Sequence, residues 1–190
     1  MRRRVSLGAA VLAALLATAV QAAPITVYMS LSGGQEFPQN GSPGVGTALI
    51  TLDDDANTFR VQATFSGLIG LTTAAHIHCC LGPSEQNVGV ATELPSFTGF
   101  PLGVTSGSYD HTFDTSLDAT WNPTFLAANG GAEGAADAMF AGLLAGRAYL
   151  NIHTTEFRAG EIRGFVAEPA SMLLIGIAAL AGAALRRRGT

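Results

Sequence analysis

Apolar and polar residues alternate in seven short segments of this chain. Between positions 59 and 65, Phe59, Val61, Ala63 and Phe65 alternate with polar residues, which places the first set on a buried face and the second in water. Similar runs occur at Ile25–Ser32, Gly46–Leu52, Ala74–Cys79, Gly107–Phe113, Ala148–Thr154 and Glu161–Val166. Turn-forming clusters rich in Gly, Asp, Asn and Pro separate these runs. The pattern predicts an all-β protein with an antiparallel sandwich of short strands.

One region changes to helical periodicity. Asn122-Pro123 supplies an N-cap followed by proline at the first helical position, and Asn129-Gly130-Gly131 ends a short helix at 124–128. The next stretch, 132–145, carries four bulkier apolar residues at helical spacing, namely Ala136, Met139, Phe140 and Leu143. We expect a short helical insertion that packs against the sandwich.

The first 22 residues have the layout of a signal peptide. Arg2, Arg3 and Arg4 form a positive region, residues 5–20 are apolar, and Val20-Gln21-Ala22 offers small-residue cleavage chemistry. We therefore expect export and removal of residues 1–22 by signal peptidase.

The last 23 residues, 168–190, form a second targeting segment. Glu168, Pro169, Ala170 and Ser171 precede fourteen small or apolar residues, and Arg186, Arg187 and Arg188 close the segment. Fourteen helical residues at about 1.5 Å each span about 21 Å, less than the ~30 Å hydrocarbon core. A hydrophobic helix with transient membrane association is expected, with the arginines on the cytoplasmic side.

This C-terminal pattern resembles the PEP-CTERM sorting signal of Gram-negative bacteria, in which a Pro-Glu-Pro box precedes an apolar helix and an arginine cluster. Ala167 stands where the first proline of that box would be. The resemblance implies processing by the membrane enzyme exosortase. It also implies that the product reaches the periplasm, the outer surface or the extracellular matrix.

Between the two targeting segments, residues 23–167 have the size of a single domain. This span holds four arginines, no lysine and thirteen acidic residues, a formal charge of −9. Such an acidic surface would repel phosphate backbones, which argues against nucleic acid as a partner. The span also lacks a Gly-X-Ser-X-Gly elbow, a phosphate-binding glycine loop and a His-Glu-X-X-His motif.

The only two cysteines, Cys79 and Cys80, are adjacent. Neighbouring Cα atoms lie about 3.8 Å apart across a trans peptide, below the ~4.4 Å lower limit of ordinary disulfides. The pair cannot join distant strands. A vicinal bridge, free thiols and a metal-bound pair all stay open.

Three of the four histidines lie in strand-like segments. In an extended chain His76 and His78 share one face, while Ile77 lies on the other. By the same parity His153 and Asn151 lie opposite Leu150 and Ile152, and Glu161 and Arg163 lie opposite Ile162. If the apolar members face the core, the polar members face outward. If these strands are also neighbours, the polar members gather on one surface, where Glu161 and Arg163 would form a cross-strand ion pair.

These segments resemble the CHRD domain, named after chordin. The resemblance is carried by residues 73–78 (Thr-Ala-Ala-His-Ile-His), 149–154 (Tyr-Leu-Asn-Ile-His-Thr), 160–164 (Gly-Glu-Ile-Arg-Gly), Gly67-Leu68 and the opening 31–38 segment with Glu36. It covers about residues 25–166 and implies a β-rich extracellular module without established catalytic activity, with an extracellular protein or polysaccharide as partner.

The His76-Ile77-His78 strand is also similar to the copper-ligand strand of Cu,Zn superoxide dismutase, although that enzyme's zinc loop has no counterpart here. Three imidazoles can bind Cu or Zn, and Cys80 would be the sulfur ligand if there is one. The alternative is that the rings hydrogen-bond to Asn151, Glu161 or the backbone and hold two strands together. Asp53, Asp55 and Asn57 have part of the spacing of a calcium loop, but a solvated hairpin turn explains them better.

Two hypotheses follow from the sequence. The first is an exported, envelope-associated binding or structural module that is not an enzyme. The second is a metalloprotein with Cu or Zn at His76, His78 and His153, with superoxide-dismutase-like chemistry. For both, the expected fold is an immunoglobulin-like or superoxide-dismutase-like β-sandwich.

Overall fold

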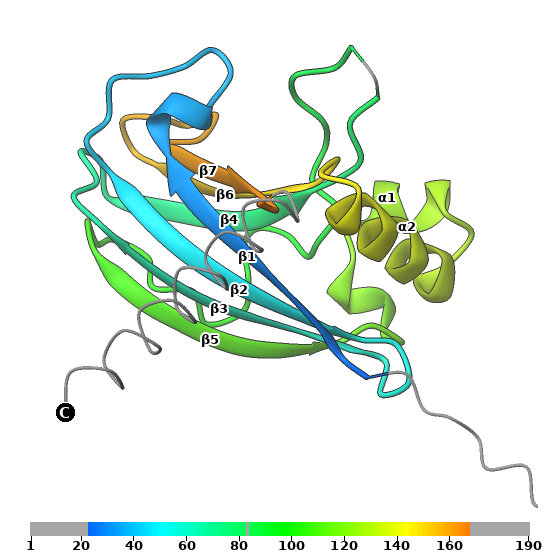
Figure 1. The fold of residues 1–190 in the computed structure, drawn as a ribbon. Helices are drawn as coiled ribbons and strands as arrows, with labels where there is room; N and C mark the ends of the chain where they lie inside the picture. The colour runs from blue at the N-terminus through cyan, green and yellow to red at the C-terminus, as the bar shows by residue number, and fades with distance from the viewer. Residues whose placement is uncertain (1–22, 83, 168–190) are drawn as a thin grey trace, which may run out of the picture.

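The computed structural model describes residues 23–82 and 84–167 (Figure 1). All seven predicted strands are present, each within two residues of its predicted ends. They are β1 (Ile25–Ser32), β2 (Val45–Asp53), β3 (Thr58–Ser66), β4 (Thr72–His78), β5 (Gly107–Asp114), β6 (Tyr149–Thr154) and β7 (Ile162–Phe165). Two 3-10 turns, η1 (Gly33–Gln35) and η2 (Asp118–Thr120), accompany them.

The strands form one antiparallel sheet in the order β4-β6-β7-β1-β2-β3-β5. β1, β2, β3 and β5 pair over most of their lengths, while β4 pairs only with β6. The contact between the half formed by β4, β6 and β7 and the half formed by β1, β2, β3 and β5 is narrow. Among the described residues, β1 pairs with β7 at Ser32–Arg163, and the residues just after β7 add the Met29–Val166 bridge and a hydrogen bond from the Ala167 amide to Tyr28 O. The sheet can therefore bend sharply between β7 and β1.

The curled sheet encloses one core. Buried side chains of β4, β6 and β7, including Ile77, Leu150, Ile152 and Ile162, belong to the same cluster as those of β1, β2, β3 and β5. The all-β antiparallel class is confirmed. In place of two separate sheets, the two halves of one curled sheet share this core, which is consistent with a β-sandwich.

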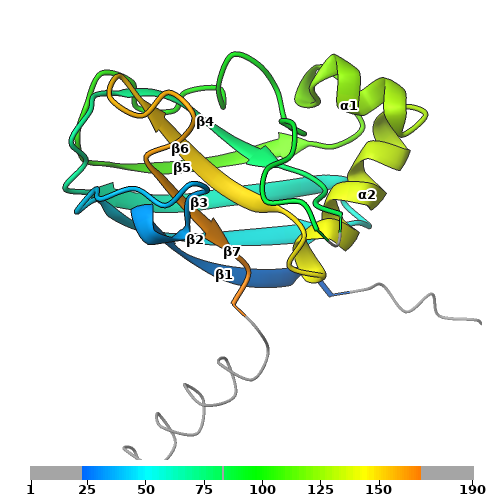
Figure 2. The same cartoon turned by 90° about the horizontal axis from the view of Figure 1, so that it is seen from above.

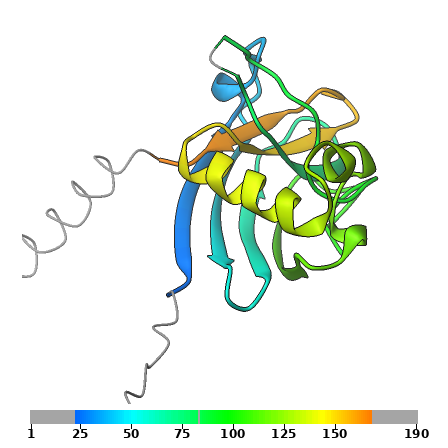
Figure 3. The same ribbon diagram turned by 90° about the vertical axis from the view of Figure 1, so that its right-hand side faces the viewer.

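The helical insertion lies at one end of the sheet (Figure 2). α1 (Pro123–Ala128) starts with the predicted cap, since the side chain of Asn122 accepts a hydrogen bond from the Thr124 amide. α2 (Ala132–Leu144) crosses in front of the strands in Figure 3, and Ala136, Met139 and Leu143 enter the core. Phe140 is only partly buried and packs at its edge. The predicted core-covering role of this insertion is therefore confirmed.

The predicted exposure of the polar face near β4, β6 and β7 is wrong. His76, His78, Asn151, Glu161 and Arg163 are each at most 8% exposed. The inward direction of the apolar partners is correct, but the segment after β4 and the segment after β1 cover the polar side as well. This part of the sheet is buried on both faces.

The predicted targeting segments, 1–22 and 168–190, lie outside the described residues. They include the sorting residues Glu168, Pro169, Ala170, Ser171, Arg186, Arg187 and Arg188. Among the helices of residues 23–167, none combines the length and apolar character needed to cross a membrane.

Candidate metal centre

His76, His78 and His153 meet on the covered face of β4 and β6. His76 and His78 are two residues apart on β4, and β6 pairs with it so that Asn151 lies opposite His76 and His153 lies opposite Ala74. The three ring centroids are 5.3 to 6.1 Å apart. One ligand nitrogen from each ring lies within 4.8 Å of the other two. The structure thus brings together the three histidines singled out from the sequence.

Each ring donates one N–H to a backbone carbonyl. Nε2 of His76 donates to Pro95 O at 2.8 Å, Nδ1 of His78 to Val88 O at 2.8 Å, and Nδ1 of His153 to Arg158 O at 3.0 Å. A carbonyl oxygen can only accept, so these contacts fix which nitrogen carries the proton in each neutral ring. The nitrogens left with a lone pair are Nδ1 of His76 and Nε2 of His78 and His153.

Burial keeps these rings neutral. Loss of solvent lowers the pKa of His76 and of His78 to about 4, more strongly than their hydrogen bonds to carbonyls raise it. Burial also lowers the pKa of the half-buried His153. At neutral pH all three lone pairs are available to a ligand.

Within residues 23–82 and 84–167, no group donates a hydrogen bond to these free nitrogens. Nδ1 of His76 is buried without a partner, and Nε2 of His78 lies 3.5 Å from Nε2 of His153. Two nitrogens on one tetrahedral ion at about 2.0–2.1 Å lie about 3.3 Å apart, close to that separation. Histidine ligands in metal sites usually donate their other N–H to a carboxylate or carbonyl, as all three rings do here. The arrangement can hold a cation.

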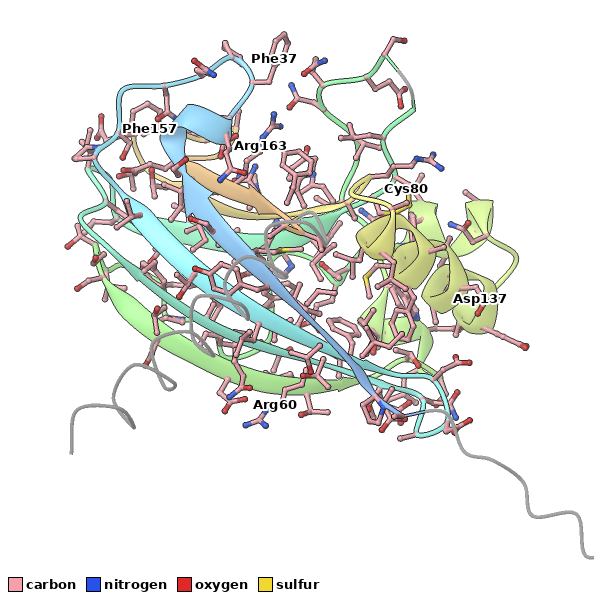
Figure 4. The ribbon with its side chains drawn as sticks, viewed as in Figure 1. Phe37, Arg60, Cys80, Asp137, Phe157 and Arg163 are labelled. Atoms are coloured by element: carbon pink, nitrogen blue, oxygen red, sulfur yellow. A yellow bond between two sulfur atoms is a disulfide. The ribbon has the colours of Figure 1, made fainter. Side chains whose placement is uncertain are left out.

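The side chains of Tyr149 and Arg163 lie beside His76, His78 and His153, which we call the histidine trio. The ring of Tyr149 stacks on His78 with centroids 4.8 Å apart, and the guanidinium of Arg163 lies 4.8 Å from the centre of the Tyr149 ring. Arg163 donates to the carbonyls of Gln35 and Gln86 and to Oδ1 of Asn87. Arg163, labelled in Figure 4, thereby ties both covering segments to β7. Its partner Asn87 directly precedes Val88, whose carbonyl orients His78.

The predicted ion pair between Glu161 and Arg163 is absent among the described residues. Arg163 lies 3.9 Å from the carboxylate of Glu36, while Glu161 accepts hydrogen bonds from Ser42, Ile69, Gly70 and Thr154. Burial alone would raise the pKa of Glu161, but these four hydrogen bonds outweigh it and lower the pKa. Asn151 joins the same buried polar cluster, and its Oδ1 has no partner. The sequence grouped these residues correctly but paired them wrongly.

Cys80 is not placed as a metal ligand. It forms a disulfide with Cys79 across a cis peptide bond, which brings the Cα atoms to 3.0 Å. Its sulfur lies against α2, 3.3 Å from Ala138 O, and does not belong to the histidine trio. The trans geometry assumed from the sequence was wrong, and the candidate centre offers nitrogen atoms alone.

Sequence reasoning missed the groups that orient the rings. Pro95, Val88 and Arg158 act through their backbone carbonyls, so their side chains carry no signal of the role. Glu36 was noted only as part of the opening motif. Burial raises its pKa to about 7, although Arg163 and Asn151 act in the opposite direction.

Comparison with known families agrees with this structure. The model of the CHRD domain matches residues 27–166, and that of the PEP-CTERM protein-sorting motif matches residues 166–188. Neither the curated proteins nor the solved structures contain a match. The sorting motif implies processing by exosortase and indicates an exported, cell-surface protein. With a family model covering most of its length, the chain belongs to the CHRD-domain family and carries a PEP-CTERM sorting motif.

Proposed function

We propose that this CHRD-domain protein binds a divalent transition-metal ion, Cu²⁺ or Zn²⁺, through His76, His78 and His153 at the cell surface, without turnover. One observation carries the proposal. Each of the three rings uses one nitrogen on a backbone carbonyl and keeps the other free beside its neighbours.

A purely structural role explains less of this geometry. If the three rings only held two strands together, each ring N–H would need a hydrogen-bond acceptor, and the backbone carbonyls supply these acceptors. Such a role does not need three acceptor nitrogens close together, and a buried nitrogen without a partner, such as Nδ1 of His76, costs about 1–3 kcal/mol. A bound cation would satisfy all three lone pairs at once.

The donor set narrows the choice of ion. Imidazole nitrogen suits Zn and Cu, whereas Ca²⁺ and Mg²⁺ prefer oxygen ligands. The disulfide withholds thiolates, which would have favoured Cu(I). His153 is the most exposed ligand and leaves a route for the ion and for a fourth ligand from solvent.

Metal titration of the untagged protein tests the proposal. We expect one equivalent of Zn²⁺ or Cu²⁺ by elemental analysis and calorimetry, and loss of that equivalent in the double variant His76→Ala, His78→Ala. His111→Ala is the matched control, because His111 lies on β5 outside the trio. A folded protein that stays metal-free in excess Zn²⁺ and Cu²⁺ would overturn the proposal. A superoxide assay on the copper-loaded protein separates binding alone from dismutase-like turnover.

A further inference from the structure

The disulfide between Cys79 and Cys80 does little for the stability of the fold. A disulfide stabilises mainly by restricting the unfolded chain, and the effect grows with the number of residues enclosed. This bridge joins adjacent residues and encloses none between them. Such a bridge adds almost nothing to the stability of an exported protein that has only these two cysteines. We therefore consider a reactive role, in thiol–disulfide exchange, for the bridge.

The two cysteines line an open cavity at the protein surface. A cavity of about 560 Å³ lies between the two cysteines, α1 and α2. Its other walls are mostly small side chains, such as Ala138, Ala141 and Ala145, with Phe125 and Arg147 also lining it. Figure 4 shows Cys80 on this helical side of the molecule. A small molecule can therefore approach the bridge at Cys80 without unfolding the domain.

The two sulfurs differ in accessibility. Cys79 is 4% exposed and belongs to the hydrophobic core, whereas Cys80 is half-buried and packs against the outside of that core. An attacking thiolate must approach an accessible sulfur, because the rate of thiol–disulfide exchange depends on access to the sulfur as well as on the pKa values of the thiols. Cys80 is the sulfur open to attack.

Helix α2 is shaped around this bridge. A Cβ on Gly142 would lie 2.5 Å from Sγ of Cys79 and 2.6 Å from Sγ of Cys80, closer than real Cβ contacts. The glycine lets the helix pack directly on both sulfurs, although glycine weakens a helix interior. The helix thus packs directly on the bridge, while both cysteines still line the cavity.

We propose that Cys79–Cys80 is a thiol–disulfide exchange site for small thiols. A thiolate attacks Sγ of Cys80, the bond between the two protein sulfurs breaks, and its electron pair leaves on Cys79, which takes up a proton. A second thiol attacks the mixed disulfide at the sulfur of the first, which releases a small-molecule disulfide and the Cys80 thiol. Two thiols are oxidised and one protein disulfide is reduced. The proposal does not depend on metal binding.

Reduction of the wild-type full chain by glutathione tests the proposal. Under native conditions we expect excess reduced glutathione to open the bridge, so that alkylation and intact mass spectrometry detect two new thiols. The circular dichroism spectrum should stay unchanged, because a bridge between adjacent residues does not hold distant parts of the fold together. A bridge that resists reduction until the protein unfolds would overturn the proposal.

Two single variants test which sulfur reacts. Cys79→Ser leaves Cys80 as the free thiol, and Cys80→Ser leaves Cys79. We expect the Cys80 thiol to form a mixed disulfide with oxidised glutathione about tenfold faster or more, because Cys79 is enclosed in the core. Equal rates, or faster reaction at Cys79, would contradict the assignment. If a variant fails to fold, the alkylation pattern of partly reduced wild type gives the same comparison.

Discussion

Nε2 of His78 and Nε2 of His153 lie 3.5 Å apart, while Nδ1 of each ring donates to a backbone carbonyl. Neither Nε2 of the neutral rings carries a proton, so the short distance brings two lone pairs together. The two histidines come from neighbouring strands whose pairing is fixed by the main chain. The fold therefore holds two electron-rich atoms side by side, and a cation between them would relieve their repulsion.

Metal affinity should fall at lower pH than it does at a site made of ordinary histidines. A metal competes with protons for imidazole, and a histidine with an ordinary pKa near 6.5 loses affinity as the pH falls below that value. Because the pKa of His76 and of His78 is about 4, and burial also lowers the pKa of His153, protons compete in more acidic solution than they do at ordinary histidines. Zn²⁺ titrations at several pH values would measure this. A steady loss of affinity from pH 7 downward would contradict the prediction.

Replacing Glu36 by Gln should change stability in a pH-dependent way. The pKa of Glu36 is raised from 4.5 to about 7 in the folded protein, so the folded state holds a proton there that the unfolded state has lost. Stability from this group is present below pH 4.5 and is lost as the pH rises to 7, by about 1.4 kcal/mol per unit at most. The Gln variant keeps a neutral group and avoids that loss. Urea unfolding measures the stability of both proteins at pH 4.5 and pH 8. Relative to wild type, the Gln variant should be more stable at pH 8 than at pH 4.5. The same stability difference at the two pH values would argue against the raised pKa of Glu36.

The strands could be read from the sequence because alternation is a local property. The inward direction of Ile77, Leu150, Ile152 and Ile162 follows from the same alternation, and so does the shared face of His76 and His78. His153 joins them only because β4 pairs with β6, which alternation alone does not show. The turn signals at Asn122 and Gly130 marked α1 for the same local reason. Apart from the place of His153, each of these features is decided within a few residues.

The covering of the polar face could not be read from the sequence. The segments over it have no period, and their positions depend on distant contacts, such as those of Arg163 with Gln35, Gln86 and Asn87. Parity correctly placed Glu161 and Arg163 on one face but could not show that loops would bring each a different partner. Cys80 was considered as a sulfur ligand because parity pointed Cys79 inward, but parity could not show that the two sulfurs bond to each other.

Replacing Glu161 by Gln should weaken the fold. The carboxylate of Glu161 accepts four hydrogen bonds, two of them from backbone N–H groups, and joins the segments at 42 and 69–70 to β6. An amide would turn its NH₂ toward some of these donors and leave buried groups unpaired, at a cost of about 1–3 kcal/mol. Urea unfolding at pH 7 measures the loss. Glu156→Gln, at an exposed position nearby, should change stability little, and equal effects in the two variants would contradict the role of Glu161.

Replacing Gly142 by Ala should destabilise the protein, against the usual ranking in helices. Alanine in a helix interior is ordinarily favoured over glycine by about 1 kcal/mol. At position 142 the added methyl group would lie 2.5 Å from Sγ of Cys79 and 2.6 Å from Sγ of Cys80, and overpacking of this kind typically costs about 1–3 kcal/mol. Ala141→Gly is the matched control on the exposed side of α2, where the ordinary ranking predicts a loss of about 1 kcal/mol. Thermal and urea unfolding measure the change in stability that each of the two substitutions causes. If Gly142→Ala instead raised stability, helix α2 would not be packed against the bridge as described.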